Sequence, residues 1–228
     1  MIGSSSSGLT LTTFWLVRHG EAENNSNARF GGWDSAPLTA RGQLQAAAVG
    51  AALATRARAA LVPPSLIISS DLARAAATAH AIANATALPV HTDPALRERT
   101  VGIFDGMSFA NAKAEHPEAY AALVARDEAA LPHGAETNAA CFARVSAGLD
   151  RVAQAHAGAT VILVSHGIAL FHMLAHITRS GPPDAGSRFF TLVDNASLSI
   201  VEHHTSADVG ASWRLCQWND NGHLRGIV

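Results

Sequence analysis

The stretch "FWLVRHGEAENN", residues 14–25, joins four apolar residues directly to an arginine, a histidine and a glycine. A short apolar run that ends in a glycine-containing loop is typical of a buried β-strand, so we expect a strand over residues 13–17. Such a strand places Arg18 and His19 together just beyond its carboxyl end. Polar side chains at that edge of a sheet need partners, which indicates a binding site there.

Apolar runs and amphipathic segments alternate along most of the chain. Further strands are predicted over 65–69, 89–92, 160–165, 196–203 and 212–219, and helices over 40–58, 72–83, 108–115, 117–128, 136–157 and 168–177. Thr39 and Asp71 are the expected caps of the first two helices. This alternation favours an α/β fold, a three-layer α/β/α sandwich with a mainly parallel central sheet.

A second apolar run, "TVILVSHG" at 160–167, ends as the first one does, with His166 followed by Gly167. Ligands of parallel sheets bind outside the carboxyl ends of the strands, so we expect His19 and His166 to face one pocket. With Arg18 and the start of the following helix, such a pocket suits a phosphoryl or sulfuryl oxyanion. A neutral imidazole can also attack phosphorus as a nucleophile.

Composition excludes several classes of protein. Of the 228 residues, 48% are hydrophobic and 15% charged, which is too apolar for a disordered chain, and a net charge of −2 does not suggest nucleic-acid or membrane binding. We expect a flexible tail over 1–12 and one domain over 13–228. The start has no secretory pattern, which favours a cytoplasmic protein. Cys141 and Cys216 are expected to be reduced, buried thiols.

Arg74 stands in the first turn of a predicted helix, where a cation opposes the helix dipole. An anion opposite the guanidinium would explain this position. Asp71, three residues earlier, offers a simpler partner. From these residues alone, a salt bridge between Arg74 and Asp71 is the favoured interpretation.

Several motifs together resemble one known family. "LVRHGEAENN" at 16–25 is similar to the signature of the histidine phosphatase superfamily, also called phosphoglycerate mutase-like. Other stretches resemble its later segments in the same order: 29–46, "SSDLARAAATA" at 69–79, "LRERTVGIFDG" at 96–106, "HGAET" at 133–137, "VSHG" at 164–167 and "WRLCQWNDNGHL" at 213–224. Because the matches extend over nearly the whole chain, the resemblance is specific.

The resemblance implies residue roles and an activity. His19 would be the nucleophile that forms a phosphohistidine, and Glu98 would protonate the leaving oxygen. The residues implied to hold the phosphoryl group are Arg18, Asn25, Arg74 and His166. The activity implied is hydrolysis of a small phosphorylated substrate, a phosphomonoesterase that uses no metal and no cofactor and has neither nucleic-acid nor membrane partners.

Some of these roles have simpler alternatives. Arginines on both sides of Glu98 suit a structural salt bridge unless they point away from it. Asn25 would otherwise be read as a loop-capping residue. Gly167 would let the backbone approach the phosphate, or would serve only as a turn residue. The aromatic residues Phe30 and Trp33 either line the pocket mouth or anchor their loop, and anchoring is slightly favoured.

Three other functions stay open. A phosphoglycerate mutase needs cations for a second anionic group, but residues 107–133 carry one lysine and one arginine among several acids, which favours hydrolysis. A zinc enzyme is suggested only by His172 and His176, which lack the glutamate of the metalloprotease motif. A non-catalytic phospho-ligand binding module is the third. Residues 99–133 are expected to form the lid that selects the substrate, and a homodimer is one open arrangement.

Overall fold

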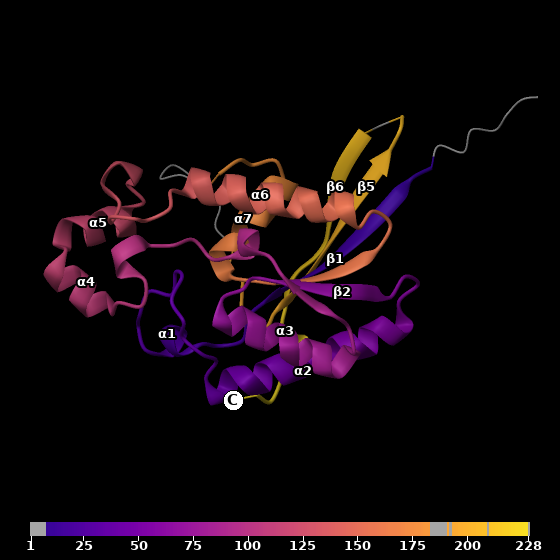
Figure 1. Cartoon of the computed structure of the whole chain (residues 1–228), viewed down its shortest axis with the longest axis horizontal. Coiled ribbons are helices and arrows are strands. Elements are labelled where there is room, and N and C mark those ends of the chain that lie inside the picture. The colour runs from indigo at the N-terminus through magenta and orange to yellow at the C-terminus, as the bar shows by residue number, and fades with distance from the viewer. Residues whose placement is uncertain (1–7, 183–190, 192, 209, 228) are drawn as a thin grey trace, which may run out of the picture.

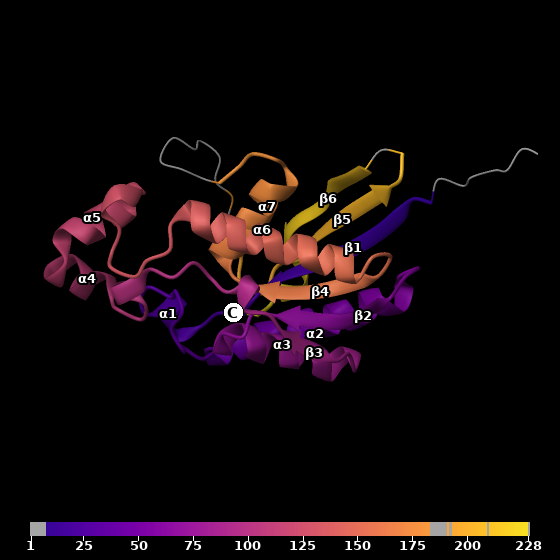
Figure 2. The same ribbon diagram turned by 45° about the horizontal axis from the view of Figure 1, so that its top comes forward.

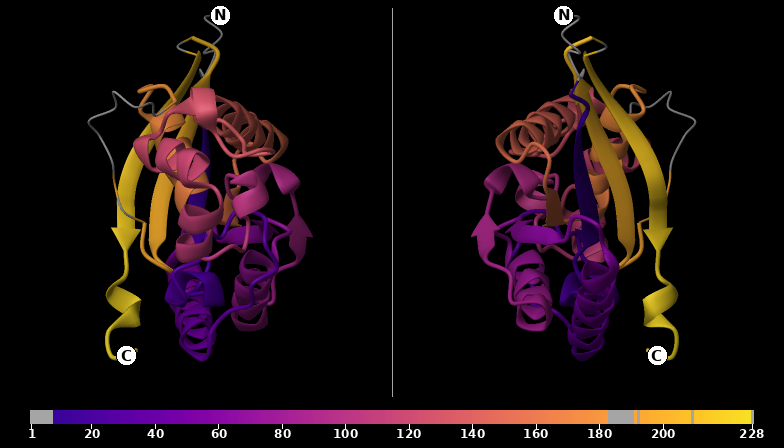
Figure 3. Two further views of the ribbon diagram at one scale, coloured as in Figure 1. Left: turned by 90° about the vertical axis from the view of Figure 1, so that its left-hand side faces the viewer. Right: turned by 90° about the vertical axis from the view of Figure 1, so that its right-hand side faces the viewer.

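The computed structural model describes residues 8–182, 191, 193–208 and 210–227. They form one six-stranded sheet of order β3-β2-β4-β1-β5-β6, with β3 and β6 at opposite edges (Figure 3). The strands are β1 (Thr10–Arg18), β2 (Pro64–Ser69), β3 (Val90–Thr92), β4 (Thr160–Ser165), β5 (Leu198–Ser206) and β6 (Gly210–Asp220). Strands β1 to β4 are parallel to one another, β5 is antiparallel to β1, and β6 is antiparallel to β5, which confirms the mainly parallel sheet.

Helices cover both faces of the sheet and make the predicted three layers (Figure 1). The pair α2 and α3 packs on one face, and the pair α6 and α7 on the other. The helices are α1 (Glu23–Ser26), α2 (Ala40–Ala59), α3 (Ala73–Thr86), α4 (Phe109–Glu115), α5 (Pro117–Ala125), α6 (Asn138–Ala155) and α7 (Gly167–Ile177). None of those in the described residues is both long and apolar enough to cross a bilayer.

The side chains of β1 alternate between the two halves of the core. Phe14 and Leu16 belong to the apolar cluster under α6 and α7, whereas Trp15 and Val17 belong to the cluster under α2 and α3. All four are at most 4% exposed. Because both faces of this strand are covered, it reads in the sequence as an unbroken apolar run.

The register of the parallel strands brings the two histidine motifs to one edge. Arg18 at the end of β1 lies opposite Ser165 at the end of β4, so His19 and His166 follow at the same level. Ser70, just after β2, donates its backbone N–H to the Val164 carbonyl. Three strand ends therefore meet at one place, as expected for a site at the carboxyl edge of a sheet.

Most element ends differ by a few residues from those predicted, and two of the differences overturn a prediction. Strand β1 begins at Thr10 rather than residue 13, because Thr10 pairs with Thr205 of β5; residues 10–12 are therefore not part of a tail, and 1–7 lie outside the described residues. Helix α3 begins at Ala73 without a side-chain cap, so the predicted cap by Asp71 is wrong.

The segment between β3 and α6 builds a separate apolar cluster at the end of the molecule toward which β4 points (Figure 2). Helices α4 and α5 lie there, beside α1. Phe30 contacts the rings of Phe104, Phe109 and Tyr120, so it anchors its loop to this cluster, as favoured from the sequence.

Both cysteines are free thiols, but only one is buried. Cys141 is inaccessible to solvent on α6, and burial raises the pKa of its thiol. Cys216 lies on the outer strand β6 and is exposed, so the prediction of burial is wrong for this residue.

Candidate active site

The side chains of His19 and His166 meet in the interior. Their ring centroids are 5.0 Å apart, and the two residues are 3% and 0% exposed. His19 follows β1, and His166 is the residue immediately before α7. The structure therefore brings together the two imidazoles that the sequence predicted to share a pocket.

Hydrogen bonds fix which nitrogen of His19 carries the proton. Its Nδ1 lies 2.7 Å from the Gly20 carbonyl oxygen, which can only accept, so Nδ1 is the donor. Its Nε2 accepts from the Nε–H of Arg74 at 3.3 Å. Burial, then the charges of Arg74 and Arg18, hold the pKa of His19 well below its usual value. The ring is neutral at pH 7 and keeps a lone pair on Nε2, the form that attacks an electrophile.

Close backbone packing holds the His19 loop in place. A Cβ on Gly20 would lie 2.4 Å from the Gly42 carbonyl oxygen, so only glycine fits where this loop crosses the start of α2. The backbone N–H of Gly20 donates to the Thr78 hydroxyl, and the side chain of Asn195 donates to the His19 carbonyl. The position of the imidazole is therefore set from three separate segments.

Arg74 lies inside the site, which contradicts the predicted salt bridge with Asp71. It is 2% exposed, and its guanidinium pairs with Asp34 at 2.9 Å and donates to the Gly32 carbonyl at 2.8 Å. Asp71 instead binds Arg97 through both carboxylate oxygens. The loop carboxylate of Asp34 offsets the unfavourable position of a cation at the start of a helix. The motif that contains Asp34 was recognised in the sequence, but its role was missed.

Arg18 reaches the same site from the end of β1. Its Nη1 donates to the Val193 carbonyl at 2.5 Å, whereas its buried Nε has no partner among the described residues. Burial lowers the pKa of this guanidinium, which nevertheless stays charged at neutral pH. Its carbon would lie 3.6 Å from a Cβ on Gly167, an ordinary contact, so the structure shows no steric need for glycine at Gly167.

One ring nitrogen of His166 has a hydrogen-bond partner, and the other has none among the described residues. Its Nε2 lies 2.8 Å from the Ser70 hydroxyl, and its Nδ1 is buried without a partner among the described residues. Burial, followed by the charges of His19, Arg74 and Arg18, holds the pKa of His166 well below its usual value. Buried polar atoms normally have partners, so the unpaired Nδ1 and the unpaired Arg18 Nε suit a ligand rich in acceptors.

Glu98 lies at the N-terminus of α7. Its carboxylate accepts backbone N–H bonds from Arg99 at 2.9 Å and from Ile168 and Ala169 at 3.1 Å. These two helix donors were expected to serve the phosphate, and the structure assigns them to Glu98 instead. Three backbone bonds fix the orientation of this carboxylate beside His166.

The arginines that flank Glu98 point away from its carboxylate. Arg97 pairs with Asp71 and stacks on Trp33 at 4.7 Å, and Arg99 donates to the Asn138 side chain at 3.2 Å. The indole of Trp33 in turn donates to the Glu98 carbonyl at 2.6 Å, so Trp33 anchors its loop. A salt bridge of Glu98 with either neighbour is therefore not formed.

A half-buried ion pair holds the segment that carries Glu98. Arg144 of α6 pairs with Glu136 at 2.6 Å and donates to the backbone carbonyls of Ala95, Arg97 and Glu98 at 2.9 to 3.2 Å. Glu136 belongs to the "HGAET" motif. No local pattern in the sequence indicated Arg144, because its partners come from distant loops.

Asn25 does not reach the imidazoles through the hydrogen bonds of its side chain. Its Oδ1 accepts from the Ala22 N–H at 3.0 Å and from the Asn195 side chain at 3.4 Å, which is the loop-capping arrangement. The neighbouring Asn24 is buried and donates to Asp34 at 3.1 Å. Asn24, for which no role at the site was predicted, is therefore the asparagine that contacts the partner of Arg74.

Two adjoining cavities lie next to Arg18 and Glu98, and neither His19 nor His166 lines them. A cavity of about 200 Å³ is lined by Arg18, Glu98, Gly167, Ile168, Phe171, Thr191 and Val193. A second, of about 120 Å³, shares Ile168 and Phe171 with it and is also lined by Arg99, Leu123, Val124, Arg126, Asn138 and His172. Together they offer room for a group attached to a phosphoryl moiety, and Glu98 lines the first of them.

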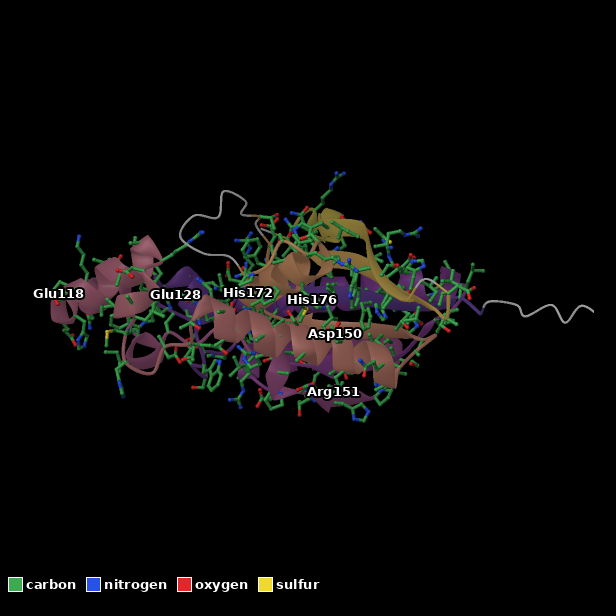
Figure 4. All side chains as sticks on the ribbon, turned by 90° about the horizontal axis from the view of Figure 1, so that it is seen from above. Glu118, Glu128, Asp150, Arg151, His172 and His176 are labelled. Carbon is green, nitrogen blue, oxygen red and sulfur yellow. The ribbon has the colours of Figure 1, made fainter. Side chains whose placement is uncertain are left out.

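The HxxxH pair on α7 serves packing. His172 is fully buried beside Phe142, and His176 bonds Asp150 of α6 at 2.9 Å (Figure 4). Within the described residues, no three histidine, cysteine or acidic side chains are grouped so that they could hold a metal.

The sequence and the fold define one class of protein. Residues 14–221 match the model of the histidine phosphatase superfamily (branch 1), and the chain belongs to this superfamily. The matched range includes Arg18, His19, Arg74, Glu98 and His166.

Individual relatives cover most of the chain. A Yersinia enterocolitica protein named "Probable phosphoglycerate mutase GpmB" is 35% identical over 92% of this chain and 94% of its own length. A mycobacterial glucosyl-3-phosphoglycerate phosphatase, solved with VO3, has a TM-score of 0.76 at 29% identity and covers 92% and 99% of the two chains. An alpha-ribazole phosphatase from Shigella flexneri has a TM-score of 0.74 at 28% identity, with 91% and 96% covered.

Proposed function

We propose that this protein is a phosphomonoesterase that hydrolyses a small phosphorylated substrate through a phosphohistidine on His19. The observation that carries the proposal is the neutral His19 ring, whose Nε2 lone pair lies beside the Arg74 guanidinium and next to His166. The phosphatases among the structural relatives support the same reaction class.

The proposed reaction has two steps. His19 Nε2 attacks phosphorus while the bond to the leaving oxygen breaks, and Glu98 gives that oxygen a proton. Water then attacks the phosphohistidine, Glu98 takes the proton from the water, and inorganic phosphate leaves. Arg18 and Arg74 offset the charge on the equatorial oxygens, and His166 donates to one of them. The scheme uses no metal and no cofactor, so chelators should not change the rate.

The structure supports some of the proposed phosphate-binding residues more strongly than others. The unpaired Arg18 Nε and His166 Nδ1 support a direct role for these two residues. Asp34 and Gly32 hold the rest of the Arg74 guanidinium, while its Nε–H donates to His19 Nε2. When a phosphoryl group binds, this N–H passes to a phosphoryl oxygen and the Nε2 lone pair becomes free to attack. We no longer propose that Asn25 and Gly167 bind the phosphate. Their proposed roles are structural: Asn25 holds its loop, and Gly167 forms the start of α7.

Phosphoryl transfer between phosphoglycerates is the second candidate function. Curated relatives carry the mutase name, and Arg99 and Arg126 both line the cavity of about 120 Å³. Residue Arg99 lies outside the segment from which cations were counted in the sequence, so a second anionic group has more partners than that count indicated. A mutase should need priming by a bisphosphoglycerate, whereas a phosphatase should release phosphate without it.

Substitution of His19 by alanine tests the nucleophile. We expect His19→Ala to remove phosphate release from every substrate of a metabolite panel that includes phosphoglycerates, sugar phosphates and nucleotides, while the thermal unfolding transition survives. The matched control is His80→Ala, because His80 is an exposed histidine on α3. Retention of most of the activity by His19→Ala would refute the proposed function.

Two further parts of the proposal concern nucleic acids and location. With a net charge of −2, we propose that the protein has no nucleic-acid partner, and that it acts in the cytoplasm. Fractionation of the source cells, with phosphatase activity as the marker, tests the location.

A further inference from the structure

Ser70 is a fully buried residue between β2 and α3 whose hydroxyl contacts His166. Its Oγ lies 2.8 Å from His166 Nε2 and accepts the backbone N–H of Leu72 at 3.3 Å. The Ser70 backbone is fixed by its N–H bond to the Val164 carbonyl at 2.9 Å. The hydroxyl is therefore held in place from the strand and from the start of the helix.

The protons around this contact can be counted. A serine hydroxyl has one proton, and Leu72 already supplies a donor to its oxygen. If His166 Nε2 also donated, the Ser70 proton would have no acceptor among the hydrogen bonds of the described residues, and His166 Nδ1 would turn a lone pair toward an anionic ligand. If the hydroxyl donates to Nε2, every proton is used and Nδ1 carries an N–H.

We propose that Ser70 is a positioning residue, which donates to His166 Nε2 and holds this ring in the tautomer that presents Nδ1–H to a phosphoryl oxygen. The inference rests on the proposed function of the site and adds a residue to it. His19 has the same tautomer, fixed by the Gly20 carbonyl, but turns its other nitrogen to the ligand. One histidine thus offers a lone pair to phosphorus while the other offers a proton to oxygen.

The tautomer can be read directly by nitrogen NMR of the full chain labelled with ¹⁵N-histidine, with His166→Gln used to assign the signals. In the wild type we expect a protonated Nδ1 and an unprotonated Nε2 at His166. In Ser70→Ala we expect the proton to move wholly or partly to Nε2. Ser70→Thr keeps the hydroxyl and should restore the wild-type signals.

Kinetics supply the second readout. With p-nitrophenyl phosphate as substrate and inorganic phosphate as inhibitor, Ser70→Ala should lower kcat/KM and weaken phosphate inhibition by on the order of tenfold, the effect of one misdirected donor. Ser69→Ala is the control, because Ser69 is equally buried but its hydroxyl donates to a backbone carbonyl. This control should keep both the tautomer and the phosphate inhibition of the wild type.

Two results would overturn the inference. One is a wild-type His166 that carries its proton on Nε2, a measurement that needs no variant to fold. The other is a folded Ser70→Ala with an unchanged tautomer and unchanged phosphate inhibition. Because the tautomer is measured without substrate, it tests Ser70 separately from the turnover experiment on His19.

Discussion

Arg74 shows how one buried cation is kept in an unfavourable position. It stands at the N-terminal end of α3, and burial lowers the pKa of its guanidinium. Asp34 faces it at 2.9 Å, while Asn24 and the Gly32 carbonyl complete the surroundings. Asp34 thus offsets both the helix dipole and the loss of solvation, and it aims the Nε–H at His19.

Removal of the Asp34 charge should therefore impair catalysis. We expect Asp34→Asn to lower kcat/KM by about 10- to 100-fold, since a small displacement of Arg74 misaligns the group that faces His19 Nε2. Asp71→Asn is the control, because Asp71 pairs with Arg97 outside the site. Steady-state kinetics on both variants decide the matter, and equal losses would show that Asp34 has no special role.

His172 couples the stability of the fold to pH. It is fully buried with both ring nitrogens unpaired among the described residues, and burial, then the charges of Arg99 and Arg144, lower its pKa to about 4. Between pH 6.5 and about 4 the unfolded chain binds a proton here that the folded chain does not. This residue therefore stabilises the fold fully above pH 6.5, and the contribution is lost as the pH falls toward 4.

The size of this effect is measurable. We expect His172→Phe to remove up to about 3 kcal/mol of the decrease in the free energy of unfolding between pH 7 and pH 4. The measurement is urea denaturation at both pH values. His19 and His166 contribute to the decrease in the same direction, so the variant keeps part of it. A decrease as large as that of the wild type would contradict the assignment.

Helix α6 acts as a clamp on the segment that carries Glu98. Its Arg144 binds three backbone carbonyls there and is itself held by Glu136. This arrangement explains why an acidic residue of the "HGAET" motif, far from the histidines in sequence, belongs to the architecture of the site. By holding this backbone segment, Arg144 fixes the position from which the Glu98 carboxylate binds α7.

Loss of the clamp should reduce both activity and stability. We expect Arg144→Ala to lower kcat by on the order of tenfold and the free energy of unfolding by about 2 kcal/mol, because half-buried Glu136 and three backbone carbonyls lose their shared donor. The control is Arg151→Ala on the same helix, whose exposed pair with Asp93 contributes little. Kinetics and urea denaturation of the two variants check this, and equal effects would count against the clamp.

For the molecule as a whole, the sequence predicted the layers, the parallel centre and the meeting of His19 with His166. These features could be predicted because apolar periodicity and the positions of strand ends are local signals in the sequence. The pairing of β1 with β5 from Thr10 onward was missed, because a strand over polar threonines at the start of the sheet is defined only by its distant partner.

The finer contacts of the site were less predictable for the same reason. Asp71 is the nearest acid to Arg74 in sequence, yet Asp34 binds it from another loop. The backbone donors of α7 were available to a phosphate by proximity, but Glu98 takes them. Choices among several chemically suitable partners depend on tertiary packing, which periodicity and spacing do not encode.

Glu98 and His166 are both held at the start of α7, apart from the outer helices α4 and α5. His166 precedes the helix and the Glu98 carboxylate binds its first turn, so the same helix end holds both groups. The outer helices α4 and α5 pack in a different apolar cluster. With the proposed function, we therefore expect amino-acid changes in that outer part to alter the preference for one metabolite over another while the spacing between Glu98 and His166 stays the same.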